Sequence, residues 1–175
     1  MQLFYSPRGG RSGSTAVYSL LEYAFYKVYD RALPEINKTP EGKPFFPGEP
    51  DIHFSLSHSR THVLCAIGSS PVGADIESPR IVNSRTAAYF GSPEELALFD
   101  PLELWVLKES YIKLIGGTLP QVKQFRFSRD KDKVIPPDPN ASSTLYRIEN
   151  CIAAASIFNA KPQTEPAKIE LATLV

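Results

Sequence analysis

The pattern of apolar and polar positions predicts one helix and three strands in the first 77 residues. Apolar side chains recur every three or four positions between residues 14 and 30, which predicts a helix capped by Ser12 or Ser14. Residues 34–50 are rich in proline, glycine and charge and are typical of a loop. Residues 51–57 alternate and predict a half-buried strand, while residues 63–67 and 72–77 predict two more strands.

The rest of the chain changes from helical to extended patterns. Residues 82–90 predict a helix, and Ser92 followed by a proline and two glutamates opens a second one. The clearest helix is predicted for residues 101–115 and ends at Gly116. Strands are expected at 124–127, 145–148, 151–158 and 168–174, with an exposed loop at 130–140. This order of elements predicts an α+β fold.

Composition restricts the classes of partner and compartment. The 175 residues include 19 basic and 19 acidic side chains, so no net charge favours nucleic acid or an anionic membrane. No apolar stretch approaches the roughly 18 residues of a membrane span, and no signal peptide pattern opens the chain. Cys65 and Cys151 lie in apolar runs, which favours buried free thiols in a reducing compartment. We therefore expect a cytoplasmic protein.

Two carboxylates share one face of the strand predicted at residues 72–77. Side chains alternate along a strand, so Asp75 and Glu77 lie on one face and Ala74 and Ile76 on the other. Adjacent carboxylates repel each other and favour a cation between them. Gly73 lies on the acidic face and is expected to leave room for a ligand. The alternative is a solvent-exposed outer face of an antiparallel sheet.

A third carboxylate lies on the predicted helix 101–115. Val106, Glu109 and Lys113 form one stripe, because residues three and four positions apart share a helix face. An exposed Glu–Lys pair of this spacing is common and is the alternative interpretation. Together with Asp75 and Glu77, however, Glu109 completes an oxygen-ligand set suited to magnesium. In such a site Lys113 would neutralise charge on a phosphoryl group.

Several further residues are candidates for binding phosphate. Ser57, His58 and Ser59 would supply hydrogen-bond donors where the strand 51–57 ends. By strand phase, however, His58 falls on the core-facing side, and a buried structural histidine is the alternative. A zinc site built from the three histidines is not favoured, because strand geometry scatters them over both faces. Lys43, Arg8 and Arg11 are candidates for contacts to phosphate or to a partner protein.

Four segments of the chain, in the order in which they occur, resemble the motifs of the 4′-phosphopantetheinyl transferases. They are Gly42-Lys-Pro44, Phe54-Ser-Leu-Ser-His-Ser59, Val72-Gly-Ala-Asp-Ile-Glu77 and Trp105-Val-Leu-Lys-Glu-Ser-Tyr-Ile-Lys113. The resemblance covers residues 42–119 and is to the class in which one chain holds two pseudosymmetric α+β halves. It implies a shortened N-terminal half-domain at residues 1–70 and a C-terminal half-domain with the metal site at residues 71–175.

The resemblance implies roles for the motif residues. Asp75, Glu77 and Glu109 match ligands of Mg²⁺, and Glu109 also matches the base that acts on the carrier serine, directly or through water. Lys113 matches the lysine that contacts the transferred phosphate.

The remaining motif residues match contacts to coenzyme A. Ser57 and His58 match residues that hold the phosphates, and Lys43 and Pro44 match the segment beside adenine. Lys108 lies within the motif and is counted with the residues that bind coenzyme A.

The resemblance implies a magnesium-dependent transferase that acts as a monomer on an acyl or peptidyl carrier protein. Glu109 or a water would take the proton of the carrier serine, whose oxygen attacks the phosphate attached to pantetheine. The leaving group is 3′,5′-ADP, and Lys113 offsets its charge. Two alternatives remain open: a silent module that binds coenzyme A or the carrier, and a metal-dependent phosphodiester or pyrophosphate hydrolase.

Overall fold

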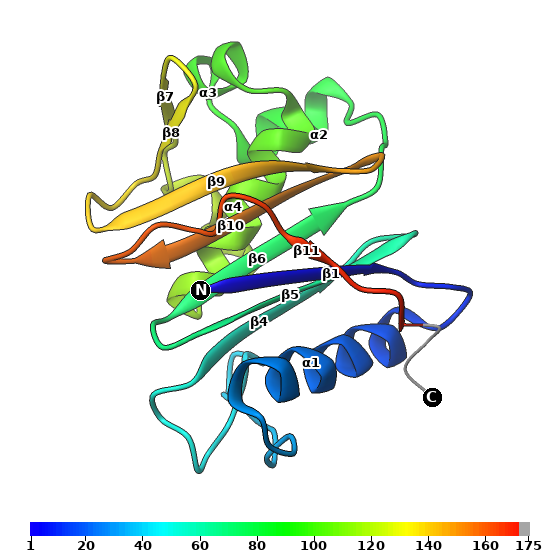
Figure 1. Ribbon diagram of the computed structural model, residues 1–175. Coiled ribbons are helices and arrows are strands. Elements are labelled where there is room, and N and C mark those ends of the chain that lie inside the picture. The colour runs from blue at the N-terminus through cyan, green and yellow to red at the C-terminus, as the bar shows by residue number, and fades with distance from the viewer. Residues whose placement is uncertain (172–175) are drawn as a thin grey trace.

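The computed structural model describes residues 1–171, in which two units of sheet and helix lie side by side (Figure 1). The first unit holds a four-stranded sheet in the order β11-β1-β5-β4, with α1 packed against it. Its elements are β1 (Gln2–Pro7), α1 (Gly13–Tyr29), β2 (Asn37–Lys38), β3 (Pro44–Phe45), β4 (His53–His58) and β5 (His62–Gly68). The short strands β2 and β3 pair only with each other and form a hairpin.

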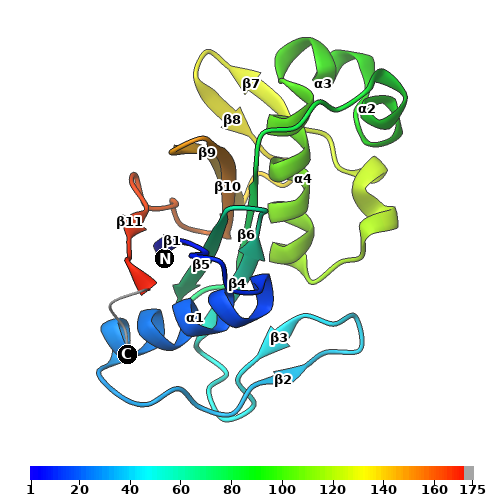
Figure 2. The same cartoon turned by 90° about the vertical axis from the view of Figure 1, so that its right-hand side faces the viewer.

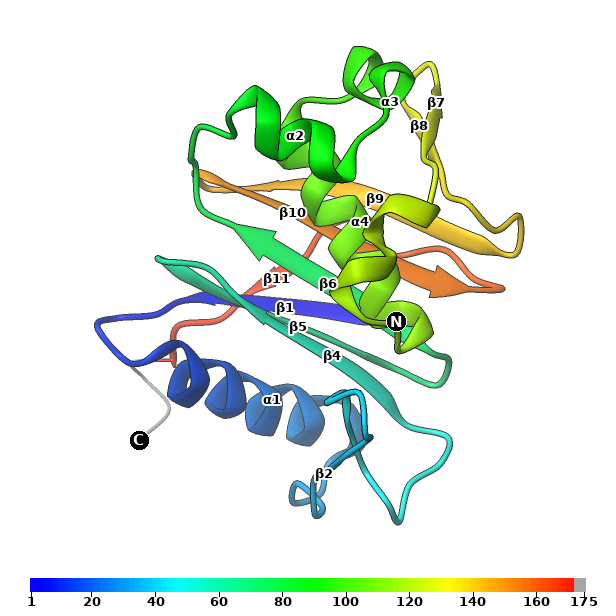
Figure 3. The same ribbon diagram turned by 180° about the vertical axis from the view of Figure 1, so that it is seen from behind.

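The second unit holds a three-stranded sheet in the order β6-β10-β9, and α4 lies across it (Figure 3). Its strands are β6 (Val72–Glu77), β7 (Ser128–Asp130), β8 (Lys133–Ile135), β9 (Ala141–Ile148) and β10 (Cys151–Phe158). Its helices are α2 (Ser84–Phe90), α3 (Pro93–Leu98), α4 (Pro101–Ile115) and the 3₁₀ helix η1 (Leu119–Gln124). The mixture of helices and antiparallel strands confirms the predicted α+β class.

Both sheets share one connectivity. In each sheet, the chain passes from a first strand (β1 or β6) to the helix that covers the sheet. A hairpin follows later in the chain, and its second strand (β5 or β10) pairs with the first strand of the sheet. β5 therefore lies between β1 and β4, and β10 lies between β6 and β9, with antiparallel pairing throughout these two sets.

The chain returns to the first unit after β10. The strand β11 (Ala167–Lys168) pairs in parallel with β1, and Leu171 is buried in the core beneath α1. The predicted boundary between half-domains at residue 70 does not account for this return of the chain. Residues beyond Phe158 pack against the first unit, which residues 2–68 form.

Serine hydroxyls join the two sheets at the seam between β4 and β6. Ser55 Oγ accepts a hydrogen bond from Ala74 N at 3.0 Å, and Ser57 Oγ accepts one from Ile76 N at 3.2 Å. The polar face predicted for residues 51–57 is therefore buried against β6, where its hydroxyls satisfy amides of a strand edge that would otherwise be unpaired.

Three apolar clusters form the core. One lies between α1 and the first sheet, and another lies between α4 and the second sheet. In the third, Leu3 and Leu64 from the first sheet meet Ala74, Ile76 and other residues of the second sheet. The faces turned away from the two helices thus share one core. Within residues 1–171, no helix combines the length and apolar character needed to cross a membrane.

The predicted elements differ from the structure in a few places. The N-terminal strand β1 was missed, and residues 124–127 form the end of η1 and a non-strand segment instead of a strand. The short hairpin strands β2, β3 and β8 fall in predicted loops. Of the strand predicted at 168–174, only Lys168 belongs to β11, and residues 172–174 lie outside the described residues.

Candidate functional site

A cavity of about 280 Å³ opens where β4, β6 and α4 meet. It is lined by Leu56, Ser57, His58, Asp75, Glu77, Trp105, Glu109 and Lys113. The structure thus brings six of the candidate site residues to one place, although they come from three separate segments between residues 57 and 113. The three carboxylates and Lys113 are therefore available to a single ligand.

Helix α4 is fixed closely against β6 by its sequence. Asp100 caps the helix through a hydrogen bond from Leu102 N, and Gly116 ends it with a left-handed backbone at φ 68°. A Cβ on Gly73 would lie 1.9 Å from the Ser110 carbonyl oxygen. The space above Gly73 is therefore filled by the α4 backbone, which corrects the expectation that this glycine leaves room for a ligand.

Asp75 is buried at the back of the cavity and is already hydrogen-bonded. Its Oδ1 accepts from Ser57 Oγ and from Lys113 Nζ, both at 2.7 Å. Ser57 is itself buried and also accepts from the Ile76 amide. Ser57 therefore orients Asp75 instead of projecting freely into the cavity.

Glu77 lies at the outer end of β6, where Trp105 and Arg80 hold it. Its Oε1 accepts from the indole Nε1 of Trp105 at 3.2 Å and from Arg80 Nη2 at 3.1 Å. Trp105 was not among the site residues predicted from the sequence. The signal that would have identified it is its position one turn before Glu109, which places it on the same helix face.

The Glu109 carboxylate is destabilised in its charged form. Burial, followed by the negative charge of Asp75 and a smaller effect of Glu77, raises the pKa of Glu109 to about 6, although Lys113 opposes the shift. One lysine therefore does not balance the three carboxylates at this position. A bound cation would restore that balance.

The donor set fits a hard divalent cation. All three side chains offer carboxylate oxygens, which magnesium prefers, and a cation bound beside Glu109 would favour its charged form, which burial and Asp75 disfavour. Within residues 1–171, however, no three histidine, cysteine, aspartate or glutamate side chains are gathered closely enough to hold a metal ion as they stand. Ser57 and Lys113 both bond Oδ1 of Asp75, and joint ligation would require the three carboxylates to move closer together.

His58 lies at the rim of the cavity and is exposed, not buried on the core side as its strand phase indicated. Its ring packs against the start of α1, where a Cβ on Gly13 would come within 2.8 Å of it. β4 ends at His58. The alternation of inward and outward side chains along the strand, from which a buried position was predicted, therefore stops at this residue.

Lys43 and Pro44 line a second cavity of about 250 Å³ that adjoins the first, with Leu56 and Lys113 shared between them. The β2–β3 hairpin lies below the C-terminal end of α4 (Figure 2). Lys43 Nζ donates to the carbonyl oxygens of Lys113 at 2.6 Å and Leu114 at 3.1 Å, and burial lowers the pKa of this lysine. Lys43 thus stabilises the end of the helix that carries Lys113.

Lys108 does not line either cavity, and its predicted contact with coenzyme A does not fit the structure. The side chain is 0% exposed, and its Nζ lies 2.9 Å from Glu95 Oε1. It also donates to the carbonyl oxygens of Phe90 and Phe125. On a helix, Lys108 and Glu109 point in different directions, so Lys108 ties α4 to α2, α3 and η1.

Arg8 and Arg11 also make bonds within the protein. Arg8 donates to the carbonyl oxygens of Arg11, Ser59 and Arg60, and Arg11 donates to that of Leu171. These contacts hold the loop between β1 and α1 against the β4–β5 turn.

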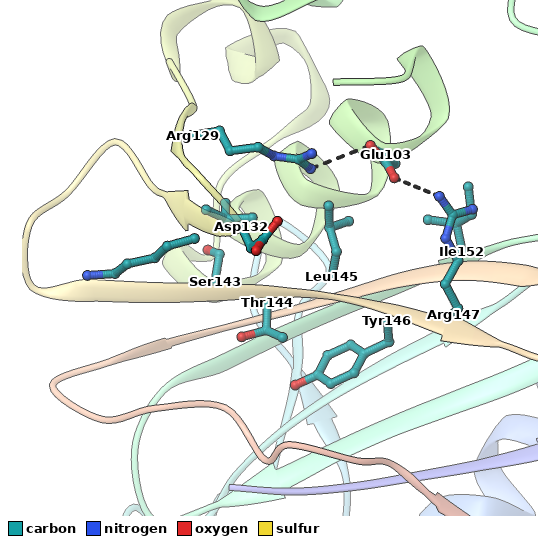
Figure 4. Close-up of a pocket in the computed structure, with 11 residues that line it drawn as sticks. Glu103, Arg129, Asp132, Ser143, Thr144, Leu145, Tyr146, Arg147 and Ile152 are labelled. Carbon is teal, nitrogen blue, oxygen red and sulfur yellow. Dashed lines mark hydrogen bonds and ion pairs between the residues drawn. The ribbon is translucent and has the colours of Figure 1, made fainter. Parts of the chain in front are cut away.

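Two cavities beside β9 have a different lining, in which no three carboxylates meet. One of about 330 Å³ lies beside β9, where Glu103 is placed between Arg129 at 3.6 Å and Arg147 at 2.8 Å (Figure 4). Another, of about 520 Å³, adjoins it near Pro136 and Pro162. In the first of these cavities each carboxylate oxygen of Glu103 faces an arginine, so it shows no charge imbalance like that at Glu109.

The chain is similar to several 4′-phosphopantetheinyl transferases. It is 34% identical over 125 residues to 4′-phosphopantetheinyl transferase gsp of Aneurinibacillus migulanus, covering 64% of this chain and 52% of that protein. It is 41% identical over 88 residues to 4′-phosphopantetheinyl transferase Sfp of Bacillus subtilis (strain 168), covering 45% and 39% respectively.

The 4′-phosphopantetheinyl transferase psf-1 of Bacillus pumilus is 34% identical over 109 residues, covering 55% of this chain and 47% of that protein. No protein-family model matches the chain. The matches span about half the length of these relatives or less. These matches carry one description, and the motif residues meet at one cavity, so the chain is similar in sequence to 4′-phosphopantetheinyl transferases over part of their length.

Proposed function

We propose that this protein transfers the 4′-phosphopantetheine group of coenzyme A to a serine of an acyl or peptidyl carrier protein, releasing 3′,5′-ADP. The observation that carries the proposal is the cavity at which Asp75, Glu77, Glu109 and Lys113 meet. Its relatives, which are named for the same transfer, support this assignment. A phosphoryl transfer needs charge neutralisation and a base, and these side chains offer both.

Asp75, Glu77 and Glu109 would hold Mg²⁺ in this proposal. The ion, when bound, would supply charge neutralisation at the pyrophosphate of coenzyme A. Lys113 would add positive charge beside the leaving phosphate, because its Nζ already lies at the cavity, 2.7 Å from Asp75.

Glu109 is the proposed base for the carrier serine. Its carboxylate borders the cavity, and its pKa of about 6 in the metal-free protein makes it a stronger base than an ordinary carboxylate. It would take the proton from the serine hydroxyl, directly or through water, as the serine oxygen attacks the phosphate attached to pantetheine. Trp105 and Arg80 would keep Glu77 in place during this step.

The two adjoining cavities suit an extended ligand. Phosphates would lie near His58 and Lys113, and the nucleotide would extend towards Lys43 and Pro44. The shared connectivity of the two sheets supports, in addition, two pseudosymmetric halves with a shortened N-terminal half. The monomeric state stays a prediction from the sequence.

The test is to incubate a purified apo-carrier protein with coenzyme A, magnesium and this protein and to measure the mass of the carrier. We expect a gain of one phosphopantetheine group, and none for a carrier whose acceptor serine is replaced by alanine. Binding of coenzyme A without a mass gain would indicate a silent module. Release of nucleotide without a carrier would indicate a hydrolase.

A further inference from the structure

Cys151 is a buried free thiol at the edge of the core shared by the two sheets, as its sequence neighbours predict, and its sulfur also contacts polar groups. Its Sγ is 3.4 Å from His62 Nδ1 and 3.4 Å from Thr61 Oγ1. It is also 3.8 Å from Ser59 Oγ and 3.9 Å from Ser78 Oγ. A thiol surrounded by a ring nitrogen and three hydroxyls has hydrogen-bonding partners for a negatively charged sulfur.

His62 is oriented as a base towards this thiol. Its Nε2 lies 3.0 Å from Glu149 Oε2, and a carboxylate only accepts, so this nitrogen carries the hydrogen. The other ring nitrogen, Nδ1, faces both Cys151 Sγ at 3.4 Å and the Thr61 hydroxyl at 2.9 Å, and Thr61 Oγ1 also lies 3.4 Å from the sulfur. Lys168 of β11 fixes Glu149 through a 2.9 Å ion pair, and Lys168 and His62 lower the pKa of Glu149.

We propose that Cys151 is a peroxide-reactive thiol, with His62 as its base and Glu149 as the group that orients the base. A nucleophile, a base within hydrogen-bonding reach and a carboxylate behind that base form the arrangement that activates thiols for nucleophilic attack. The site is separate from the cavity lined by Glu109, and the modification itself does not depend on the proposed transferase activity.

The reaction is a two-electron oxidation by hydrogen peroxide. His62 Nδ1 takes the thiol proton, and the sulfur attacks one peroxide oxygen, so that an S–O bond forms and the O–O bond breaks. The hydroxide that leaves takes the proton back from His62 and becomes water. Sulfur is oxidised to a sulfenic acid and peroxide is reduced, and a small thiol reverses the change.

The thiol is covered by only one layer of residues. The Cys151 residue is 1% exposed, but Thr61, Glu149 and Asn150 beside it are exposed, and the last two form the β9–β10 turn. Cys65 provides the contrast. It is 0% exposed in the apolar cluster under α1, where burial raises the pKa of its thiol.

Oxidation at Cys151 would reach the transferase site through two serines. Ser59 and Ser78 pack against the sulfur, and each follows a residue of the cavity directly, His58 and Glu77 respectively. Both serines are buried, so an added oxygen atom has to displace them. If the proposed function is correct, oxidation therefore lowers the transfer rate.

The first measurement is the rate at which hydrogen peroxide forms a sulfenic acid, trapped by dimedone and located by peptide mass spectrometry. In the native protein we expect label on Cys151 and not on Cys65. We also expect Cys151 to react about tenfold or more faster in the native protein than in guanidinium, because His62 acts only in the fold. Slower reaction of native Cys151, or equal labelling of Cys65, would overturn the proposal.

Variants distinguish activation of the Cys151 thiol by His62 from simple exposure of the thiol to solvent. His62→Gln should lower the native rate by about tenfold or more, and Glu149→Gln, at an exposed position, by a smaller factor. Neither should change the rate in guanidinium, and circular dichroism verifies folding. An unchanged native rate in Glu149→Gln, which removes only the orienting charge, would overturn the assigned triad even if His62→Gln does not fold.

The effect of Cys151 oxidation on the proposed transferase site is measured separately. Peroxide should lower carrier modification by the wild type, dithiothreitol should restore it, and Cys151→Ala should keep its rate under peroxide. Labelling without loss of transfer would disprove the coupling alone. Absence of transfer before peroxide treatment would disprove the proposed function and leave the labelling result valid.

Discussion

Glu109 combines two roles that make opposite demands on one carboxylate. A metal ligand has to be charged, whereas a base has to accept a proton. The surroundings favour proton binding, since burial and Asp75 raise the pKa of Glu109 to about 6. A cation favours the charged form, so binding of the ion would set the balance between the two roles.

The first prediction concerns Glu109→Gln. The amide keeps the volume and one oxygen but accepts no proton, so carrier modification should fall by about 10²–10⁴. Binding of coenzyme A should weaken far less. Initial rates and calorimetric titration measure the two effects, and Glu22→Gln, on the outer face of α1, is the control.

Asp75→Asn should behave differently, because Asp75 would act through the metal alone and raising magnesium should restore part of its rate. If magnesium restored both variants fully, Glu109 would be a ligand and not a base. Near-wild-type rates for Glu109→Gln would remove it from the mechanism.

The second prediction concerns the stability of the metal-free protein against pH. Unfolded Glu109 loses its proton near pH 4.3, but folded Glu109 does so near pH 6. The folded state binds this proton more tightly, so its contribution to stability is present below about pH 4 and is lost as pH rises to about 6. With EDTA at pH 8, Glu109→Gln should therefore be about 1–2 kcal/mol more stable than wild type, allowing for solvent screening.

Urea unfolding at pH 4 and pH 8 checks this, since the difference should disappear at the lower pH. Magnesium should reverse the order at pH 8 by stabilising the wild type more than the variant. If magnesium stabilised both equally, Glu109 would not be a ligand.

At the scale of elements, the site depends on the contact between α4 and β6. Gly73 lets the helix backbone approach the strand directly, and this brings Glu109 and Lys113 over Asp75. The sequence predicted both elements and the faces that carry their acids, because strand and helix periodicities determine them. It did not predict how closely the two would pack, since that distance depends on backbone contacts between separate segments.

The third prediction tests that contact with Gly73→Ala. The added Cβ would lie 1.9 Å from Ser110 O and 2.4 Å from Leu114 N, and neither backbone atom can move alone. We expect a loss of at least about 3 kcal/mol in the free energy of unfolding, with reduced transferase activity. In Gly48→Ala, the matched control, the Cβ meets nothing within 4 Å, so a change within about 0.5 kcal/mol is expected. Similar urea midpoints for the two variants would contradict this account.

At the scale of the whole molecule, the shared core joins the two units. Leu3 and Leu64 of the first sheet pack against Ala74 and Ile76 of the second. We therefore expect one cooperative unfolding transition, as is usual for a chain of this size.

The fourth prediction is that Leu64→Ala, in the first unit, destabilises the second unit equally. Leu64 is 1% exposed, and its truncation should cost about 2–5 kcal/mol. Trp105 is the one tryptophan of the sequence, so its fluorescence reports the second unit alone. Its urea midpoint should fall together with that of far-UV circular dichroism, whereas Leu98→Ala, at a 43% exposed position, should leave both nearly unchanged. Separate midpoints would show that the units unfold independently.

The sequence predicted the helices at residues 13–29 and 101–115 and the central strands well, because long periodic segments determine their own structure. It missed β1, whose partners β5 and β11 are about 60 and 160 residues away. It also misplaced Lys108 among the ligand-binding residues, because a motif does not show which helix face is covered by later segments. The polar groups around Cys151 come from three separate segments, the β4–β5 turn, the end of β6 and the β9–β10 turn, so no local pattern predicts their meeting.

The serine seam between β4 and β6 gives the molecule an internal reporter. The Ile76 amide donates to Ser57 Oγ, and the same hydroxyl donates to the Asp75 carboxylate. Any cation that withdraws electron density from Asp75 changes the polarisation of this short chain of hydrogen bonds. The amide proton resonance of Ile76 should therefore shift when magnesium binds, while that of Ala74, whose acceptor is Ser55, should shift less. Magnetic resonance would thereby detect filling of the site without substrate, carrier or turnover.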